Sequence, residues 1–192
     1  MRIKTDVIER AIQVAIEAHQ GQNRKGTDMP YITHPLAVGI ILAKAGADDQ
    51  VVAGILHDTV EDTMLSLADI EENFGRRIAG LVEAASEPDK SLPWKERKEH
   101  TIAYLKTAPL DVRTLACADK LHNIRSIKRD HDAIGDELWS RFNHGKADQE
   151  WYYRNVVESL GVNDGFKLLE QLRSGVDEVF GSTSADMRKN PL

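Results

Sequence analysis

Residues 51–62 read Val51-Val52-Ala53-Gly54-Ile55-Leu56-His57-Asp58-Thr59-Val60-Glu61-Asp62 and join an apolar run directly to a group of titratable side chains. The apolar run predicts a buried helix. Placing charged groups at the end of such a helix costs on the order of several kcal/mol unless something compensates them. A bound metal ion is a common compensation. The stretch therefore predicts a helical protein with a metal site in its core.

Working outward, helical spacing of apolar residues recurs along the chain, whereas the strict alternation typical of half-buried strands is scarce. The spacing predicts helices over residues 6–19, 35–45, 51–58, 67–75, 76–85, 93–106, 109–129, 149–160 and 166–180, with a loop at 22–33 and an irregular segment at 130–147. We expect His34 to cap the second helix. The predicted fold is an all-α, single-domain helical bundle over residues 1–180, followed by a disordered tail at 181–192.

Composition narrows the class of protein. The chain has 192 residues, 41% of them hydrophobic and 29% charged, as in ordinary globular domains. A formal net charge of -6 argues against broad nucleic-acid binding, which needs a cationic surface, but leaves room for a small anionic ligand. Cys117 is the single cysteine, so neither an intrachain disulfide nor a thiolate zinc cluster is expected. No apolar run is long enough to span a membrane and the start lacks a signal-peptide core, so we expect a cytoplasmic protein without membrane association. The oligomeric state stays open.

Two candidate metal ligands, His57 and Asp58, are adjacent in the chain. On a regular helix neighbouring side chains point about 100° apart, so both can reach one ion only at a helix end or bend. The polar residues that follow them fit such an end. His34, just before Pro35, can bring an imidazole from a separate element.

A fourth candidate ligand, Asp119, shares a predicted helix face with the apolar Leu115 and Ile127. A buried carboxylate is either protonated or paired, so a salt bridge is the alternative to a metal for this residue alone. Together the candidates His34, His57, Asp58 and Asp119 offer two nitrogens and two carboxylates. A set without sulfur suits an open manganese, iron, cobalt or zinc centre better than a closed structural zinc site.

Such a centre predicts phosphohydrolase chemistry, because the ion lowers the pKa of a bound water and neutralises charge on a phosphate. Glu61 and Asp62, one helical turn beyond the ligand pair, are the candidate base and water-orienting residues. A nucleotide with several phosphates also needs cationic partners, because the metal engages only one or two oxygens. The candidates are Arg24 and Lys25 in the predicted loop, Arg97 and Lys98 on a charged helix, and Lys120 and Arg125 near Asp119. Ordinary solvated charge is the alternative for these residues.

The remaining histidines, His19, His100, His122, His131 and His144, lack a neighbouring acid pair and are expected on the surface or in packing. The aromatic run at residues 151–153 is typical of a core rather than of a base-stacking platform. The stretch Arg141-Phe142-Asn143 is a candidate for a nucleoside contact.

Three motifs in this order resemble the HD-superfamily hydrolase domain of RelA/SpoT proteins. They are Arg24-Lys25 followed by Pro30-Tyr31-Ile32-Thr33-His34-Pro35, then Leu56-His57-Asp58-Thr59-Val60-Glu61-Asp62-Thr63, then Ala118-Asp119-Lys120-Leu121-His122-Asn123. Asp89-Lys90-Ser91-Leu92-Pro93, running into Glu96-Arg97-Lys98, is similar to a stretch of the short, hydrolase-only branch that includes the metazoan SpoT homologue. The resemblance covers roughly residues 1–160.

The resemblance implies a helical HD fold in which His34, His57, Asp58 and Asp119 hold manganese, and in which Glu61 and Asp62 handle the catalytic water. Members of that family remove the 3′-pyrophosphate from ppGpp and pppGpp. Arg24 or Lys25, together with Asn123, match positions that touch the nucleotide there. Two alternatives stay open: an HD phosphohydrolase acting on another nucleotide or nucleotide cofactor, and a nucleotide sensor without catalysis.

Overall fold

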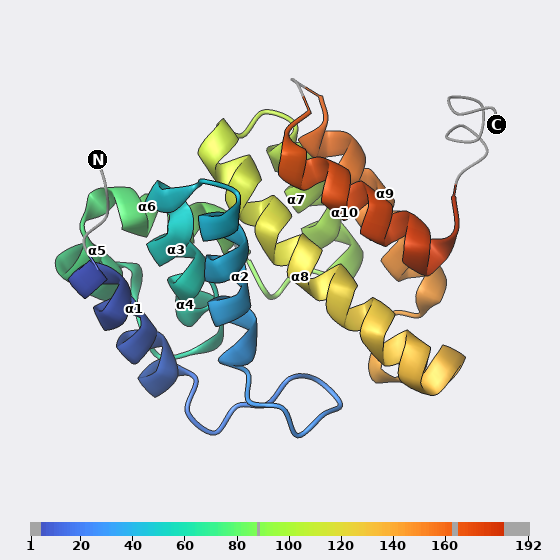
Figure 1. Ribbon diagram of the computed structural model, residues 1–192, viewed down its shortest axis with the longest axis horizontal. Coiled ribbons are helices and arrows are strands. Elements are labelled where there is room, and N and C mark those ends of the chain that lie inside the picture. Colours follow the sequence, from blue (N-terminus) through green and yellow to red (C-terminus); the bar gives the residue numbers. More distant parts are fainter. Residues whose placement is uncertain (1–4, 88, 163–164, 183–192) are drawn as a thin grey trace.

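The long helix α8 (Leu110–Ile134) forms the axis of the molecule (Figure 1). The computed structural model describes residues 5–87, 89–162 and 165–182. On one side α8 contacts α2 (Thr33–Lys44), α3 (Val51–Leu56) and α6 (Arg76–Ala85). On the other side it contacts η2 (Gly135–Arg141), α9 (Lys146–Leu160) and α10 (Lys167–Phe180). Residues that face these two layers are therefore brought together along α8.

Other helical elements complete the two layers. They are α1 (Thr5–Ala18), η1 (Asp48–Gln50), α4 (Thr59–Asp62), α5 (Leu67–Phe74) and α7 (Trp94–Leu105). The described ranges contain no β-strand, only an isolated bridge between Asn23 and Pro30. The all-α prediction is confirmed. Among the described helices, none combines the length and apolar character that crossing a bilayer would need.

Two glycines allow α2 and α3 to pack closely. A Cβ atom at Gly39 would lie 2.8 Å from Ile55 Cγ1, and one at Gly54 would overlap Leu42. Glycine inside a helix is destabilising by roughly 0.5–1 kcal/mol relative to alanine. At these two positions the close packing of α2 against α3 offsets that cost. The first turn of α2 consequently lies beside the end of α3, with the ring centroids of His34 and His57 5.1 Å apart.

The structure corrects two details of the predicted helices. His34 lies inside the first turn of α2, and Ile32 occupies the capping position without a side-chain cap. Helix α8 continues past Arg129 to Ile134, so the segment 130–147 is more regular than predicted and contains the end of α8, η2 and the start of α9. The extension has a physical cause: no helix-breaking residue precedes Gly135, which has a φ of 61°.

Helix α5 begins with a capping box, in which Asp69 N–H donates to Ser66 Oγ and Ser66 N–H donates to Asp69 Oδ2. Most of the predicted tail, residues 183–192, lies outside the described residues, so the tail and the 1–180 domain boundary stay predictions.

Candidate metal centre and adjoining cavity

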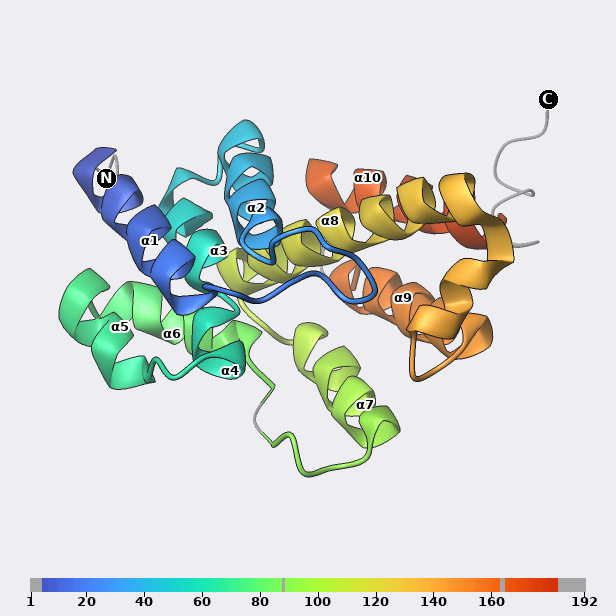
Figure 2. The same cartoon turned by 90° about the horizontal axis from the view of Figure 1, so that it is seen from below.

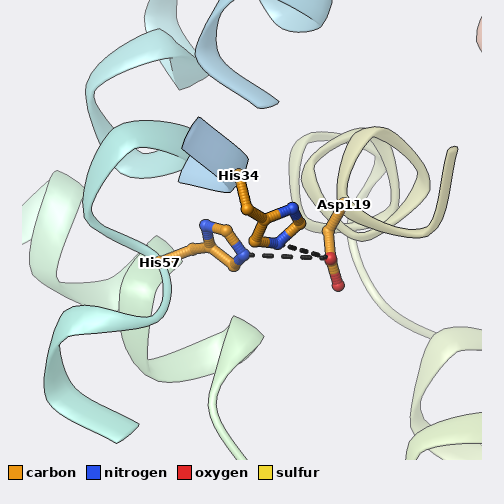
Figure 3. A group of neighbouring side chains, drawn as sticks. All are labelled: His34, His57 and Asp119. Carbon is orange, nitrogen blue, oxygen red and sulfur yellow. Dashed lines mark ion pairs between the residues drawn. The ribbon is translucent and has the colours of Figure 1, made fainter. Parts of the chain in front are cut away.

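His34, His57 and Asp119 turn their side chains toward one another (Figure 3). One potential ligand atom from each lies within 4.8 Å of the other two. Asp119 Oδ1 is 3.2 Å from His34 Nε2 and 3.9 Å from His57 Nε2. The three residues come from the first turn of α2, the turn after α3 and the middle of α8. The fold therefore joins positions that are distant in the sequence.

Asp58 lies against the same group. Its Oδ1 atom is 3.1 Å from His57 Nε2, and its Oδ2 atom is 3.5 Å from His34 Nε2. Both His57 and Asp58 sit in the turn between α3 and α4, which is the helix end that their adjacency required. All four predicted ligands are thus brought together.

The hydrogen bonding of His57 fits a metal ligand. In the neutral ring Nδ1 donates to the carbonyl oxygen of Gly54 at 2.8 Å, so the lone pair available to an ion is on Nε2. That Nε2 atom is buried, has no hydrogen-bond partner and faces the carboxylates of Asp58 and Asp119. A metal-bound histidine is typically held in this way, with its other nitrogen donating to a carbonyl.

His34 is held by His122, which was expected on the surface or in packing. His122 Nδ1 lies 2.6 Å from His34 Nδ1. Burial, together with the nearby charges of His34 and Arg24, lowers the pKa of His122 to about 4, so its ring is neutral at pH 7. A neutral His122 can accept a hydrogen bond from His34 Nδ1, which leaves His34 Nε2 free to bind an ion. Asp119 and His122 are three residues apart and share a helix face, so their spacing could have indicated that His122 lies near the candidate ligands.

The electrostatics of the group favour a positive charge between the rings. Burial lowers the pKa of His57, but the carboxylates of Asp58 and Asp119 outweigh that effect and raise it to about 9. Burial raises the pKa of Asp58, but the charge of His57 brings it well below its usual range. A divalent cation supplies the positive charge that these carboxylates stabilise.

Asp119 also forms an ion pair and hydrogen bonds with residues that were predicted to bind substrate. Lys120 Nζ lies 2.7 Å from Asp119 Oδ2, so the alternative of a salt bridge also holds, with a lysine as partner. Asn123 Nδ2 donates to Asp119 Oδ1 at 2.6 Å, and Arg24 Nη2 donates to Asn123 Oδ1 at 2.7 Å. This chain of contacts connects the loop before α2 to the candidate ligands.

Glu61 and Asp62 lie on the short helix α4, beside the ligand group but outside it. Lys90 Nζ is 3.4 Å from Glu61 Oε1 and 2.8 Å from Asp62 Oδ1. Tyr31 connects Asp62 to the candidate centre, because its hydroxyl donates to Asp58 Oδ2 at 2.6 Å and lies 3.4 Å from Asp62 Oδ2. Neither Tyr31 nor Lys90 was predicted as a site residue from the sequence, because these contacts cross between separate segments.

Glu87 joins Glu61 to the charged helix α7. Its backbone N–H donates to Glu61 Oε2 at 3.1 Å, and its carboxylate pairs with Arg97 and with Lys98 Nζ, the latter at 2.5 Å. Burial raises the pKa of Glu87, but the hydrogen bond and charge of Lys98 and the charge of Arg97 bring it below its ordinary value. The carboxylate is therefore ionised and orients both cations.

We expect Glu87→Gln to lower the free energy of unfolding by about 1–3 kcal/mol, because the substitution weakens two charge-assisted bonds of a largely buried carboxylate. Urea denaturation at pH 7 measures the change. Glu83→Gln is the matched control, since Glu83 is exposed on α6. Equal stability of the two variants would contradict the proposed strength of these pairs.

A cavity of about 730 Å³ adjoins the centre. Its lining includes the predicted substrate-binding residues Arg24, Lys25, Lys98 and Asn123, and further cations at Arg97, Lys120, Arg129 and Arg141, against a single acid, Asp130. Arg125 is absent from this lining and instead donates to Gln171. Apolar and aromatic side chains form the rest of the wall, among them Ile127, Phe142, Tyr152 and Tyr153. The cavity therefore suits an anionic ligand that also carries a flat apolar part.

Comparison with known proteins places the chain in a family. A sequence profile described as an HD domain matches residues 11–142. A GTP pyrophosphokinase of Streptomyces coelicolor is 45% identical over 125 residues, which cover 63% of this chain and 15% of that protein, so this chain spans only a small part of that long relative. Guanosine-3′,5′-bis(diphosphate) 3′-pyrophosphohydrolase MESH1 of Xenopus tropicalis is 39% identical over 127 residues, covering 64% of this chain and 70% of that protein.

Two solved structures share the fold. The crystal structure of lmo0812 from Listeria monocytogenes has a TM-score of 0.73 and 37% identity, and covers 78% of this chain and 99% of that one. A metazoan ortholog of SpoT that hydrolyzes ppGpp has a TM-score of 0.77 and 26% identity, and covers 95% of this chain and 100% of that one. The chain belongs to the HD-domain family, and within it groups with the short relatives of SpoT.

Proposed function

We propose that this chain is a divalent-metal phosphohydrolase that removes the 3′-pyrophosphate from guanosine 3′,5′-bis(diphosphate) and from its 5′-triphosphate counterpart. The observation that carries the proposal is the convergence of four ligand-type side chains around the buried, unpartnered Nε2 atom of His57, beside a cation-lined cavity. The names of the MESH1 and SpoT relatives support this choice of substrate.

His34, His57, Asp58 and Asp119 would hold the ion. When bound, a divalent ion supplies charge neutralisation at the phosphate and lowers the pKa of a bound water. The mixed nitrogen and oxygen donors suit manganese, although other divalent transition metals share this preference. The donor set and its hydrogen bonding fit such an ion.

The remaining side chains would position the substrate and move protons. Water adds to phosphorus, the bond from phosphorus to the ribose 3′ oxygen breaks, and that oxygen takes up a proton. Glu61 and Asp62 would orient the water and transfer protons. Lys98 would contact the phosphates of the reacting end, and Arg24, Lys25 and Asn123 would contact the rest of the nucleotide. A cytoplasmic location stays a prediction.

Product analysis tests the proposal. Incubation of the protein with ppGpp and Mn²⁺ should release pyrophosphate and GDP in equal amounts, resolved by ion-exchange chromatography. A chelator should abolish release and added Mn²⁺ should restore it, because catalysis requires the ion. A panel of other nucleotides and nucleotide cofactors forms the comparison. Release of orthophosphate, cleavage at the 5′ end, or faster turnover of another nucleotide would contradict the assigned reaction.

Added Mn²⁺ should also raise the thermal stability of the folded protein. An ion that binds only the folded chain raises the melting temperature in proportion to the logarithm of its concentration above Kd. A melting temperature that is insensitive to Mn²⁺ would contradict the candidate metal centre itself, independently of which nucleotide is the substrate.

A further inference from the structure

The end of the large cavity remote from the candidate metal centre is built by two segments that meet there. The loop between α1 and α2 runs along α8 toward η2 (Figure 2). Lys25 Nζ donates to Asn143 Oδ1 at 3.0 Å. Arg141 packs against Gly26, where a Cβ atom would lie 2.8 Å from Arg141 Cδ and where φ is +70°. The close approach of Arg141 thus depends on glycine at this position.

This distal end lies far from the reacting centre. Asp119 and Asp130 are eleven residues apart on the same helix, α8, so about 16 Å separates them along the helix axis. Asp119 belongs to the candidate ligand group, and Asp130 lines the cavity. A ligand whose reacting phosphate is at the centre can therefore extend toward Asp130 along the cavity.

The distal end carries its own excess of positive charge. Arg129 Nε lies 3.6 Å from Asp130 Oδ1, and Arg141 Nη1 lies 3.5 Å from Asp130 Oδ2. Lys25 precedes Gly26, which packs against Arg141, so the distal end holds three cations and one acid. Asp130 orients the two guanidinium groups but neutralises only one positive charge.

The cations at the metal end are arranged differently. Arg97 and Lys98 share the carboxylate of Glu87, and Lys120 pairs with Asp119. Apolar side chains such as Ile127, Leu138 and Phe142 also line the cavity. The cavity is therefore cationic in two separate places, a pattern that matches a ligand with phosphates at both ends of a nucleoside.

We propose that Lys25, Arg129 and Arg141 form a second anion subsite that binds the 5′-phosphates of the nucleotide while its 3′ end is at the candidate metal centre. The assignment of the 3′ end rests on the proposed function. Guanidinium groups suit this task because they stay charged and bind phosphate oxygens through two parallel hydrogen bonds. The ligand class is a nucleoside 5′-diphosphate or 5′-triphosphate.

Calorimetric binding of GDP and of guanosine, both in the presence of EDTA, tests the subsite without requiring turnover or metal. The wild-type protein should bind GDP at least about tenfold more tightly than guanosine, because each charge-assisted hydrogen bond contributes on the order of a tenfold change in Kd. Arg141→Gln should weaken GDP binding about tenfold and leave guanosine binding unchanged. Arg129→Gln should act in the same direction, and it avoids any effect of losing the contact with Gly26.

Arg125→Gln is the matched control, because Arg125 lies on the same helix but bonds Gln171 outside the cavity. It should leave both affinities unchanged. Equal affinity of the wild-type protein for GDP and guanosine would overturn the subsite. So would a loss of GDP affinity in Lys98→Gln that neither Arg129→Gln nor Arg141→Gln reproduces, because the 5′-phosphates would then occupy the metal end. A protein that binds GDP as described but releases no pyrophosphate from ppGpp would refute the proposed function alone.

Discussion

Asp58→Asn is expected to lower hydrolytic turnover on the order of a thousandfold or more and to weaken Mn²⁺ binding at least about a hundredfold. The substitution keeps the size of the side chain and replaces a charged ligand by a neutral one. Loss of partners that only orient a ligand already costs about 10–100-fold in metal affinity, so loss of a ligand charge should cost more.

Asp58 is a cleaner position for this test than Asp119. Asp119 pairs with Lys120 at 2.7 Å, and removing its charge would leave a largely buried lysine without that partner. Asp58 instead accepts a hydrogen bond from Tyr31 at 2.6 Å, and the amide oxygen of asparagine can accept the same bond. The folded state of Asp58→Asn should therefore survive while its affinity for the ion falls.

The measurements are metal content after gel filtration, pyrophosphate release and the melting temperature with and without Mn²⁺. Asp132→Asn is the control, because Asp132 lies exposed on α8 and pairs with Lys128 at the surface. Wild-type metal content and turnover in Asp58→Asn would remove Asp58 from the ligand set. Wild-type metal content without turnover would assign Asp58 to catalysis instead.

The candidate ligands could be predicted from the sequence because each is marked by the residues next to it in the chain. An apolar run that ends in His57 and Asp58 requires a helix end, and the structure places a turn there. Asp119 on an apolar helix face indicated burial of its carboxylate. His34 was predicted both to cap the second helix and to supply a candidate ligand, and only the capping role was wrong, since its side chain faces the candidate centre.

Contacts between distant segments were not predictable from spacing. Tyr31 contacts Asp58, and Glu87 contacts Glu61, Arg97 and Lys98, across turns whose geometry depends on tertiary packing. The end of α8 was missed for a related reason, because the segment 130–134 lacks an apolar stripe and is stabilised partly by the Lys128–Asp132 pair at 2.7 Å. Periodicity reports burial, and exposed helical turns carry little of that signal.

Charge distribution reconciles an acidic chain with an anionic substrate. The formal net charge is -6, yet Lys and Arg predominate among the charged residues that line the large cavity. A concave surface of one sign focuses the field and attracts oppositely charged ligands even when the whole protein carries the other sign. Net charge therefore excludes an extended nucleic-acid surface more reliably than it excludes a nucleotide pocket.

Glu61→Gln and Asp62→Asn are expected to lower turnover of ppGpp by about 10²–10⁴-fold each, the range typical of a positioned proton-transfer group. Both residues lie on α4 outside the group of convergent ligands, so Mn²⁺ content and GDP affinity should stay within about threefold of wild type. Single-turnover rates together with calorimetry separate these effects. Lys90 contacts both acids and should remain bound to the unsubstituted one in each variant.

Glu72→Gln on the exposed side of α5 is the control for this pair and should behave as wild type. Unchanged turnover in both variants would leave the water without its assigned base, and a loss of Mn²⁺ in either would move that residue into the ligand set.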